Sequence, residues 1–380
     1  MWIPLLAEDA NAVFSSRSFH GAKKALEKGN MTLLLADQSI LSKVKNVLKG
    51  KKGCGELPTF RSLIEAEEYV SKREMGNPSD FDLPNIDNPD VTEKLKRSID
   101  SGRMEYFITS LVDSYKNRYS QSDYGFDAAN WIYQHWAETT SSRSDIDVVK
   151  FRHDNFEQNS IIATITGSSK MDGDNVVVLG AHLDSIRSDI MSHNEMKAPG
   201  ADDDGSGITV LNEVIQTIVD TGYKPITTIQ IMAYAYEEGG LKGSRDIARK
   251  YKQARKNVLG MLNFDMVGYN GNTDNVICFQ DREEDEFYNN SDQIYFLKQL
   301  MRAYLNDIPY GSSFCGYECS DHVNWSNNGY PANIIDECEM SPFYHTKDDT
   351  VDNIDVIQIS RFAQLAVVYL SEIAKGRITC

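Results

Sequence analysis

The sequence predicts an α/β protein with a mixed, mostly parallel central sheet that helices cover on both faces. Short, nearly continuous apolar runs alternate with stretches of helical periodicity, which is the pattern of parallel strands buried on both faces. The chain has 380 residues, of which 41% are hydrophobic and 25% charged, as in a folded soluble protein. This length suits one large domain with a smaller unit.

A small α/β unit is predicted at the N-terminus. Residues 31–36 are typical of a strand, and helical patterns follow at about 39–48 and 60–74. The segment 76–90 is rich in Pro, Asn, Asp and Gly, as linkers are. We therefore expect residues 1–88 to form a separate unit and residues 89–380 to form the main domain.

The main domain is predicted to begin with two amphipathic helices, over residues 91–116 and 124–137. Four strands and four further helices are expected at 160–166, 176–180, 228–236 and 259–265, and at 207–219, 244–252, 294–305 and 357–374. In open sheets of this kind, binding sites form beyond the carboxyl ends of the strands.

The charge balance excludes some partners. Asp and Glu number 56 against 39 Lys and Arg, which gives a net charge of -17. Such a surface repels nucleic acid and anionic membranes, so we expect neither as a partner. No apolar run approaches the ~20 residues of a membrane helix. Residues 1–10 do not resemble a signal peptide, so we expect a mature form whose signal has been removed.

The six cysteines include no CxxC pair, so a zinc site built from cysteines is not expected. Cys315 and Cys319 are four residues apart around Gly316. This spacing can close a small disulfide if the turn is tight. The spacing alone leaves a disulfide and a buried pair of free thiols equally open.

Carboxylate and imidazole side chains gather at the predicted strand ends and in the turns that follow. Carboxylates crowded at one edge repel one another, and buried unpaired charge is costly. Two histidines and three carboxylates would resolve this by binding two zinc ions, with one carboxylate bridging. The two histidines and five acidic residues from which such ligands would come are His182, Asp184, Asp203, Glu237, Glu238, Asp265 and His345.

Each part of this pattern also has a structural explanation. His182 alone could be a core histidine, residues 202–204 could be a solvated turn or a helix N-cap, and neighbouring glutamates are common. The repetition of such residues at successive strand ends favours the metal site.

The ordered motifs resemble those of the secreted bacterial leucyl aminopeptidases with a two-zinc site. They are His-Leu-Asp-Ser at 182–185, Ala-Pro-Gly-Ala-Asp-Asp-Asp at 198–204, Ala-Tyr-Glu-Glu at 235–238, Asp-Met at 265–266, Cys-Gly-Tyr-Glu-Cys-Ser-Asp-His at 315–322 and His-Thr at 345–346. The resemblance spans residues 91–375. It implies a secreted, monomeric aminopeptidase that acts on peptides with free N-termini. Residues 89–380 would be its catalytic domain, and residues 1–88 a propeptide-like or accessory unit.

The resemblance also implies a metal role for five residues. His182 and Asp265 would bind one zinc ion, Glu238 and His345 would bind the other, and Asp203 would bridge the two.

Further roles concern the substrate. Glu237 would be the general base on the water that the two zinc ions share. Asp184 would accept the second N–H of the first histidine ligand and fix its tautomer. Tyr317 would donate a hydrogen bond to the substrate carbonyl oxygen, held in place by a Cys315–Cys319 disulfide.

The segment 331–345 departs from the family because it is shorter and acidic. An acidic side chain in the pocket for the first residue would favour Lys or Arg, whereas an apolar wall would favour Leu-type residues. Both preferences stay open. The residues expected at this pocket are Met266, Phe279, Asp336, Glu337 and Tyr344.

Three other functions are compatible with such a scaffold: a single-zinc glutaminyl cyclase-like acyl transferase, a non-catalytic ectodomain and a relative of the carboxypeptidases. The complete set of two-metal ligands argues against the first, and the intact ligands and base argue against the second. Substrates with blocked ends would distinguish the third.

Overall fold

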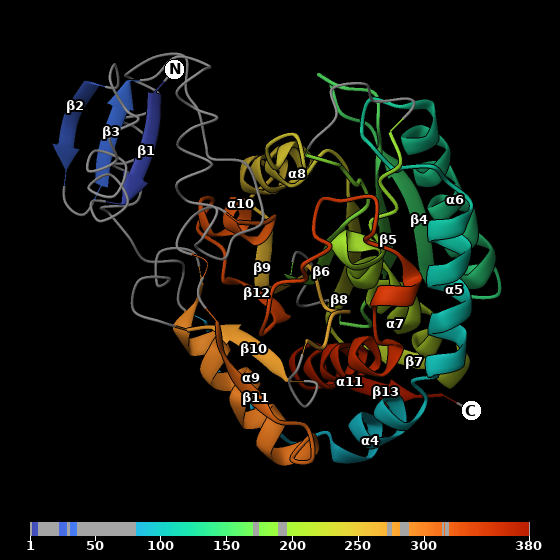
Figure 1. Cartoon of the computed structure of the whole chain (residues 1–380). Coiled ribbons are helices and arrows are strands. Elements are labelled where there is room, and N and C mark those ends of the chain that lie inside the picture. The colour runs from blue at the N-terminus through green and yellow to red at the C-terminus, as the bar shows by residue number, and fades with distance from the viewer. Residues whose placement is uncertain are drawn as a thin grey trace.

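An eight-stranded mixed sheet forms the centre of the protein, in the strand order β11-β10-β12-β9-β6-β8-β5-β4 (Figure 1). The structure, a computed structural model, describes residues 2–6, 23–28, 31–35, 81–169, 175–188, 196–271, 276–281, 289–313, 315 and 319–379. The strands are β4 (Ile146–Phe151), β5 (Ser160–Ile165), β6 (Asn175–His182), β8 (Thr228–Tyr234), β9 (Asn257–Phe264), β10 (Ile277–Gln280), β11 (Tyr310–Ser313) and β12 (Ala332–Glu337).

The strand directions confirm the predicted fold class. The four central strands β12, β9, β6 and β8 run parallel to one another. Strand β5 pairs antiparallel with β8, β4 with β5, and β10 with β12. The sheet is therefore mixed, with its parallel part at the centre.

Helices cover both faces of the sheet, as predicted (Figure 1). Alternate residues of β6 explain this: Val177 and Leu179 enter the larger hydrophobic core, while Val176 and Val178 enter the smaller one. The larger core packs against α4 (Pro89–Arg97), α5 (Ser101–Asp113), α6 (Asp123–Thr140), α7 (Gly207–Thr221), α9 (Ser291–Tyr304) and α11 (Val356–Ile373). The smaller core packs against α8 (Lys242–Gln253) and α10 (His322–Ser326).

Helix α11 is, among the described helices, the one long and apolar enough to cross a membrane by length and composition. Of its apolar window, 78% is buried inside the protein. Its composition is therefore explained by its place in the larger core.

The structure corrects several expected elements. The single helix predicted over residues 91–116 is divided into α4 and α5, because the Asp100 carboxylate caps α5 by accepting the N–H groups of Gly102 and Arg103. Strands β4, β10, β11 and β12 were not expected. The same holds for the small pair β7 (Tyr223–Pro225) and β13 (Gly376–Ile378).

The N-terminal region contains a three-stranded antiparallel sheet in the order β1-β3-β2. Its strands are β1 (Trp2–Leu6), β2 (Lys23–Lys28) and β3 (Met31–Leu35), of which β3 was expected. The helices predicted at 39–48 and 60–74 lie outside the described residues.

Part of the predicted linker packs on the main domain. Phe81 is buried in the larger core, 5.8 Å from Phe296 between ring centroids. The carboxylate of Glu372 accepts the N–H groups of Asp87 and Asn88. Residues 81–88 therefore belong structurally with the main domain, although the sequence assigned them to the N-terminal unit.

Candidate metal centre

Three adjacent strand ends bring acidic and imidazole side chains together. His182 is the last residue of β6 and pairs in register with Tyr234, the last residue of β8. Glu237 and Glu238 come shortly after β8, and Asp265 directly follows β9. Because β9, β6 and β8 are parallel neighbours, their carboxyl ends meet at one edge of the sheet.

Asp203 lies between the two histidines. It belongs to the acidic turn of residues 201–206 that leads into α7. Its Oδ1 lies 3.0 Å from Nε2 of His182, and its Oδ2 lies 3.1 Å from Nε2 of His345. Asp265 Oδ1 is 3.5 Å from the first of these nitrogens, and Glu238 Oε2 is 2.8 Å from the second. The structure thus gathers all five predicted metal ligands in one cluster.

The spacing within this cluster fits metal coordination. Ligand atoms about 2.0–2.1 Å from a tetrahedral zinc ion lie about 3.3 Å from one another. The four distances above run from 2.8 to 3.5 Å, on both sides of that value. Glu238 Oε1 and Asp265 Oδ1 are buried and have no hydrogen-bond partner among the described residues. A cation bound here would compensate for their lost hydration.

Asp204 lies near the cluster but is bound to the backbone. One of its oxygens is within 4.8 Å of ligand atoms of His182 and Asp265. However, its Oδ2 accepts the N–H of His182 and its Oδ1 accepts the N–H of Gly207, both at 2.9 Å. A Cβ at Gly207 would lie 2.4 Å from the carbonyl oxygen of Phe264, so only glycine allows this approach. Asp204 therefore holds the turn, and its neighbour Asp203 faces both histidines.

The buried charges shift one another's pKa values. Burial opposes a charge on Asp203, but hydrogen bonds with both histidines outweigh it and lower the pKa of Asp203. Burial also opposes a charge on His345, yet the negative charge of Glu238 and bonds to both carboxylates raise the pKa of His345 to about 10. Burial raises the pKa of Glu238 to about 7 and that of Glu237 well above its usual range. Imidazole protons therefore balance the carboxylates, and a metal ion must displace them to bind.

Asp184 supports the segment that carries the two glutamates. Its carboxylate accepts the N–H groups of Glu237 at 2.9 Å and of Glu238 at 3.2 Å. The carboxylate of Asp184 was also expected to accept the ring N–H of His182, and the structure differs in this contact. Nδ1 of that ring lies 3.0 Å from the main-chain carbonyl oxygen of Asp184 and 3.7 Å from its carboxylate. The carboxylate oxygens are occupied by backbone N–H groups, so the carbonyl orients the imidazole.

Two supporting residues lie in or next to motifs that the sequence had singled out, but their roles were not predicted. Ser320 donates from Oγ to Oδ2 of Asp265 at 2.5 Å. The carboxylate of Asp349 accepts the N–H groups of Asp202 at 2.8 Å and of Asp203 at 3.1 Å. Ser320 follows the second cysteine of the 315–322 motif, and Asp349 belongs to an acidic pair after the last histidine.

A buried arginine lies beside the acidic turn. Arg118 is 1% exposed and donates from Nε to the carbonyl oxygen of Leu183 at 2.9 Å and from Nη2 to that of Gly200 at 2.8 Å. It ties the loop after β6 to the start of the turn. No pattern in the sequence marks this residue.

Two of the predicted pocket residues are placed differently from the expectation. Phe279 is fully buried in the larger core, so it does not line an open pocket. Asp336 accepts a hydrogen bond from Ser313 Oγ at 2.7 Å and another from Gln280 Nε2 at 3.0 Å. Its carboxylate therefore already has partners within the sheet. Met266, directly after the ligand at the end of β9, is 2% exposed.

The remaining pocket residues, Glu337 and Tyr344, have different surroundings. Glu337 is 4% exposed, and its carboxylate accepts the N–H groups of Tyr269 at 2.8 Å and of Ser341 at 3.0 Å. The Tyr344 ring stacks on that of His345, with 3.7 Å between centroids. Of these two, only Tyr344 lies against a predicted ligand.

Four cysteines form two disulfides. Cys315 pairs with Cys319, as the resemblance implied, and Cys278 pairs with Cys338, which joins β10 to the segment after β12. Tyr317 lies outside the described residues, so its predicted role stays a prediction.

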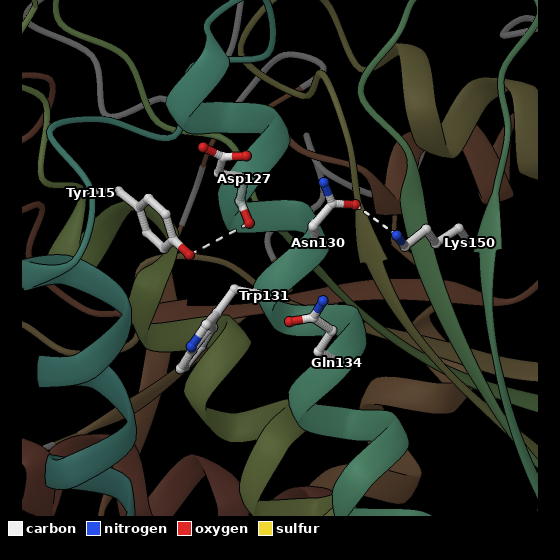
Figure 2. Close-up of a pocket in the computed structure, with 6 residues that line it drawn as sticks. All are labelled: Tyr115, Asp127, Asn130, Trp131, Gln134 and Lys150. Carbon is white, nitrogen blue, oxygen red and sulfur yellow. Dashed lines mark hydrogen bonds between the residues drawn. The ribbon is translucent and has the colours of Figure 1, made fainter.

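A separate surface cavity of about 480 Å³ lies beside α6 and the edge strand β4 (Figure 2). Two hydrogen bonds join its lining residues: Lys150 Nζ donates to Asn130 Oδ1 at 2.7 Å, and the Tyr115 hydroxyl donates to the carbonyl oxygen of Asp127 at 3.4 Å. None of the five predicted ligands lines it. The lining residues are Tyr115, Asp127, Asn130, Trp131, Gln134 and Lys150.

Known proteins share this sequence pattern and fold. The chain is 37% identical over 309 residues to leucine aminopeptidase 1 of Arthroderma otae. The aligned region covers 76% of this chain and 78% of that protein. Its fold is similar to the crystal structure of the Legionella pneumophila LapA aminopeptidase, with a TM-score of 0.79, 22% identity and 98% of each chain covered. It is also similar to a glutaminyl cyclase of Porphyromonas gingivalis, with a TM-score of 0.56, 18% identity and coverage of 72% of this chain and 98% of that chain.

The family assignment rests on the sequence matches. The relative from Arthroderma otae is fungal, so the expected restriction to bacterial enzymes is not confirmed. Residues 160–370 match Peptidase family M28. This match spans more than half of the chain and contains all five residues of the cluster, so the chain belongs to peptidase family M28.

Proposed function

We propose that this chain is a zinc-dependent aminopeptidase that removes single residues from the N-termini of peptides. The observation that carries the proposal is the position of Asp203 between His182 and His345, beside buried oxygens of Glu238 and Asp265 that have no hydrogen-bond partner in the described part of the chain. The family and the name of the fungal relative support the same activity.

Two zinc ions would be held by this cluster. His182 and Asp265 would bind one ion, Glu238 and His345 the other, and Asp203 would be the shared ligand. Bound zinc lowers the pKa of a water molecule and polarises a carbonyl group. The ligand-to-ligand distances and the orphaned oxygens support this assignment.

Glu237 is proposed as the general base. Asp184 fixes its backbone N–H, and its buried Oε1 has no hydrogen-bond partner in the described part of the chain. Burial raises the pKa of Glu237, so this carboxylate can take a proton from the attacking water and deliver it to the leaving amine. Tyr317 is proposed to donate a hydrogen bond to the substrate carbonyl oxygen.

Aminoacyl p-nitroanilides test this function directly. The protein should cleave substrates with a free amine but not their N-acetylated forms, and a chelator should abolish cleavage until zinc is restored. Metal analysis should find two zinc ions per chain. Cyclisation of N-terminal glutamine by a protein with one zinc ion would indicate the cyclase alternative. A protein that turns over neither kind of substrate would be a non-catalytic ectodomain.

The first substrate residue is proposed to be large and apolar. Asp336 and Glu337 already use both of their carboxylate oxygens to accept hydrogen bonds within the protein, so each has fewer lone pairs left and is held in place by its partners rather than directed at a Lys or Arg side chain. We expect kcat/KM for Leu-p-nitroanilide to exceed that for Lys-p-nitroanilide by about tenfold or more at low salt. A preference for Lys or Arg that disappears in Asp336→Ala would reverse this assignment.

Residues 1–88 are proposed to be a propeptide-like or accessory unit of a secreted protein. The two disulfides support an oxidising compartment.

A further inference from the structure

Ser160, His153 and Asp246 form a hydrogen-bonded Ser–His–Asp arrangement next to the segment that carries the proposed base Glu237. The proposed reaction does not use these three residues. His153 Nδ1 lies 2.9 Å from Oδ2 of Asp246 on α8, and its Nε2 lies 2.8 Å from Oγ of Ser160 at the start of β5. Ser160 is fully buried, and its Oγ also accepts the N–H of Ala235 at 3.0 Å. A buried hydroxyl with these partners cannot reach a substrate, so the three residues are not a nucleophilic triad.

We propose that His153 and Ser160 are positioning residues for the base Glu237, an inference that rests on the proposed aminopeptidase function. With a neutral ring, the hydrogen bonds run in one consistent direction. His153 Nδ1–H donates to Asp246, its Nε2 accepts the Ser160 hydroxyl proton, and Ser160 accepts the N–H of Ala235. Ala235 lies two residues before Glu237, so the relay restrains the backbone that carries the base.

The neighbouring residues complete this support. Side chains accept the N–H groups of four consecutive residues, 235–238. Besides Ser160, the acceptors are Gln158 Oε1 and the two carboxylate oxygens of Asp184. The rings of His153, Phe156 and Tyr236 also stack, with centroid separations of 4.3 and 5.0 Å. A change at His153 therefore reaches both residues before Glu237, Ala235 through Ser160 and Tyr236 through Phe156.

The surroundings of His153 favour the neutral ring. Asp246 and Lys250 face it from α8, and Asp154 faces it from its own loop. Burial lowers the pKa of His153 and outweighs the attraction of Asp246. A protonated ring would point a second N–H at Ser160, whose hydroxyl proton would then lose its acceptor. Acidification should therefore leave the buried hydroxyl proton of Ser160 without its acceptor and disturb the orientation of this side chain.

Three variants test the relay. Ser160→Ala removes the acceptor for Ala235 and should lower kcat about tenfold through misplacement of the base, with KM and zinc content unchanged. Amide hydrogen exchange at Ala235 should accelerate by a similar factor. Glutamine can both donate to Asp246 and accept from Ser160, so His153→Gln should keep kcat near that of the wild type at neutral pH, whereas His153→Ala should not.

Ser371→Ala is the matched control, because it removes a buried, hydrogen-bonded hydroxyl from α11 and should leave kcat unchanged. The relay is refuted if Ser160→Ala lowers Tm as Ser371→Ala does while kcat and exchange at Ala235 stay at wild-type values. Exchange is measured without turnover. A protein without aminopeptidase activity would therefore refute the proposed function but still report on the restraint of Ala235.

Discussion

The metal cluster and the His153 relay meet at the same backbone segment, residues 235–238, but differ in how their polar atoms are satisfied. In the cluster, Glu237, Glu238 and Asp265 each keep a buried oxygen without a hydrogen-bond partner in the described residues. In the relay, both ring nitrogens of His153 and the hydroxyl of Ser160 have partners. Since buried polar atoms are normally paired, the unsatisfied set indicates where a ligand binds and the satisfied set indicates support.

The largest effect is expected at the shared ligand. Asp203→Ala should remove both zinc ions and all measurable activity, because the two histidines lose the carboxylate between them. Metal analysis per chain and p-nitroanilide hydrolysis measure this, with Glu339→Ala as a control at an exposed carboxylate. Loss of a single ion would show that Asp203 belongs to only one metal position.

The next effect separates the two neighbouring glutamates. Glu237→Ala should lower kcat by about 10²–10⁴-fold, the usual contribution of a general base, and should retain two zinc ions. Glu238→Ala should instead lose an ion, since its Oε2 lies 2.8 Å from His345 Nε2. If the Glu237 variant is the one that loses zinc, the two roles must be exchanged.

A smaller effect is expected at Ser320, whose hydroxyl donates a hydrogen bond to one carboxylate oxygen of the proposed ligand Asp265. Ser320→Ala removes the hydrogen bond to Asp265 Oδ2 and should weaken zinc binding about 10–100-fold. Competition with a chelator measures the affinity. The half-buried Ser110 provides the control, because its hydroxyl donates to the carbonyl oxygen of Tyr106 within α5. Equal affinities in the two variants would mean that Ser320 does not orient this ligand.

The relay also predicts a modest dependence of stability on pH. The folded-state pKa of His153 is lowered, so the unfolded chain binds the proton first as the pH falls below about 6.5. The free energy of unfolding should therefore decrease from about pH 6.5 down through the folded-state pKa of His153. Urea unfolding at several pH values, with excess zinc, should show a steeper loss for the wild type than for His153→Gln. Identical slopes would contradict the assignment.

The smallest effect should come from a region outside both sites. Limited proteolysis should cut between residues 76 and 80 rather than after Phe81, which is buried in the larger core. The product should be at least as active as the full chain, since the five ligands and the relay all lie beyond residue 150. Loss of activity after this cut would make the N-terminal unit an integral part of the enzyme.

The five members of the cluster could be predicted from the sequence because most of them lie at or after strand ends, where a change from apolar to charged residues is visible. The relay could not be predicted, since His153 and Asp246 are far apart in the chain and meet only through the packing of α8. Arg118 has no local signal for the same reason. Phe279 was misplaced because the four-residue strand β10 is too short for its sequence to show which face enters the core.

The proposed ligands lie far apart in the chain, from His182 to His345. A ribosome must therefore translate the chain through residue 345 before the second histidine of the cluster is present. Until then, a nascent chain can present Asp203 to one imidazole of the cluster only, and the second set of ligands lacks its histidine. Under the proposed function, a nascent chain that stops short of His345 cannot trim its own N-terminus or those of neighbouring chains, and its activity begins only after this histidine has been added.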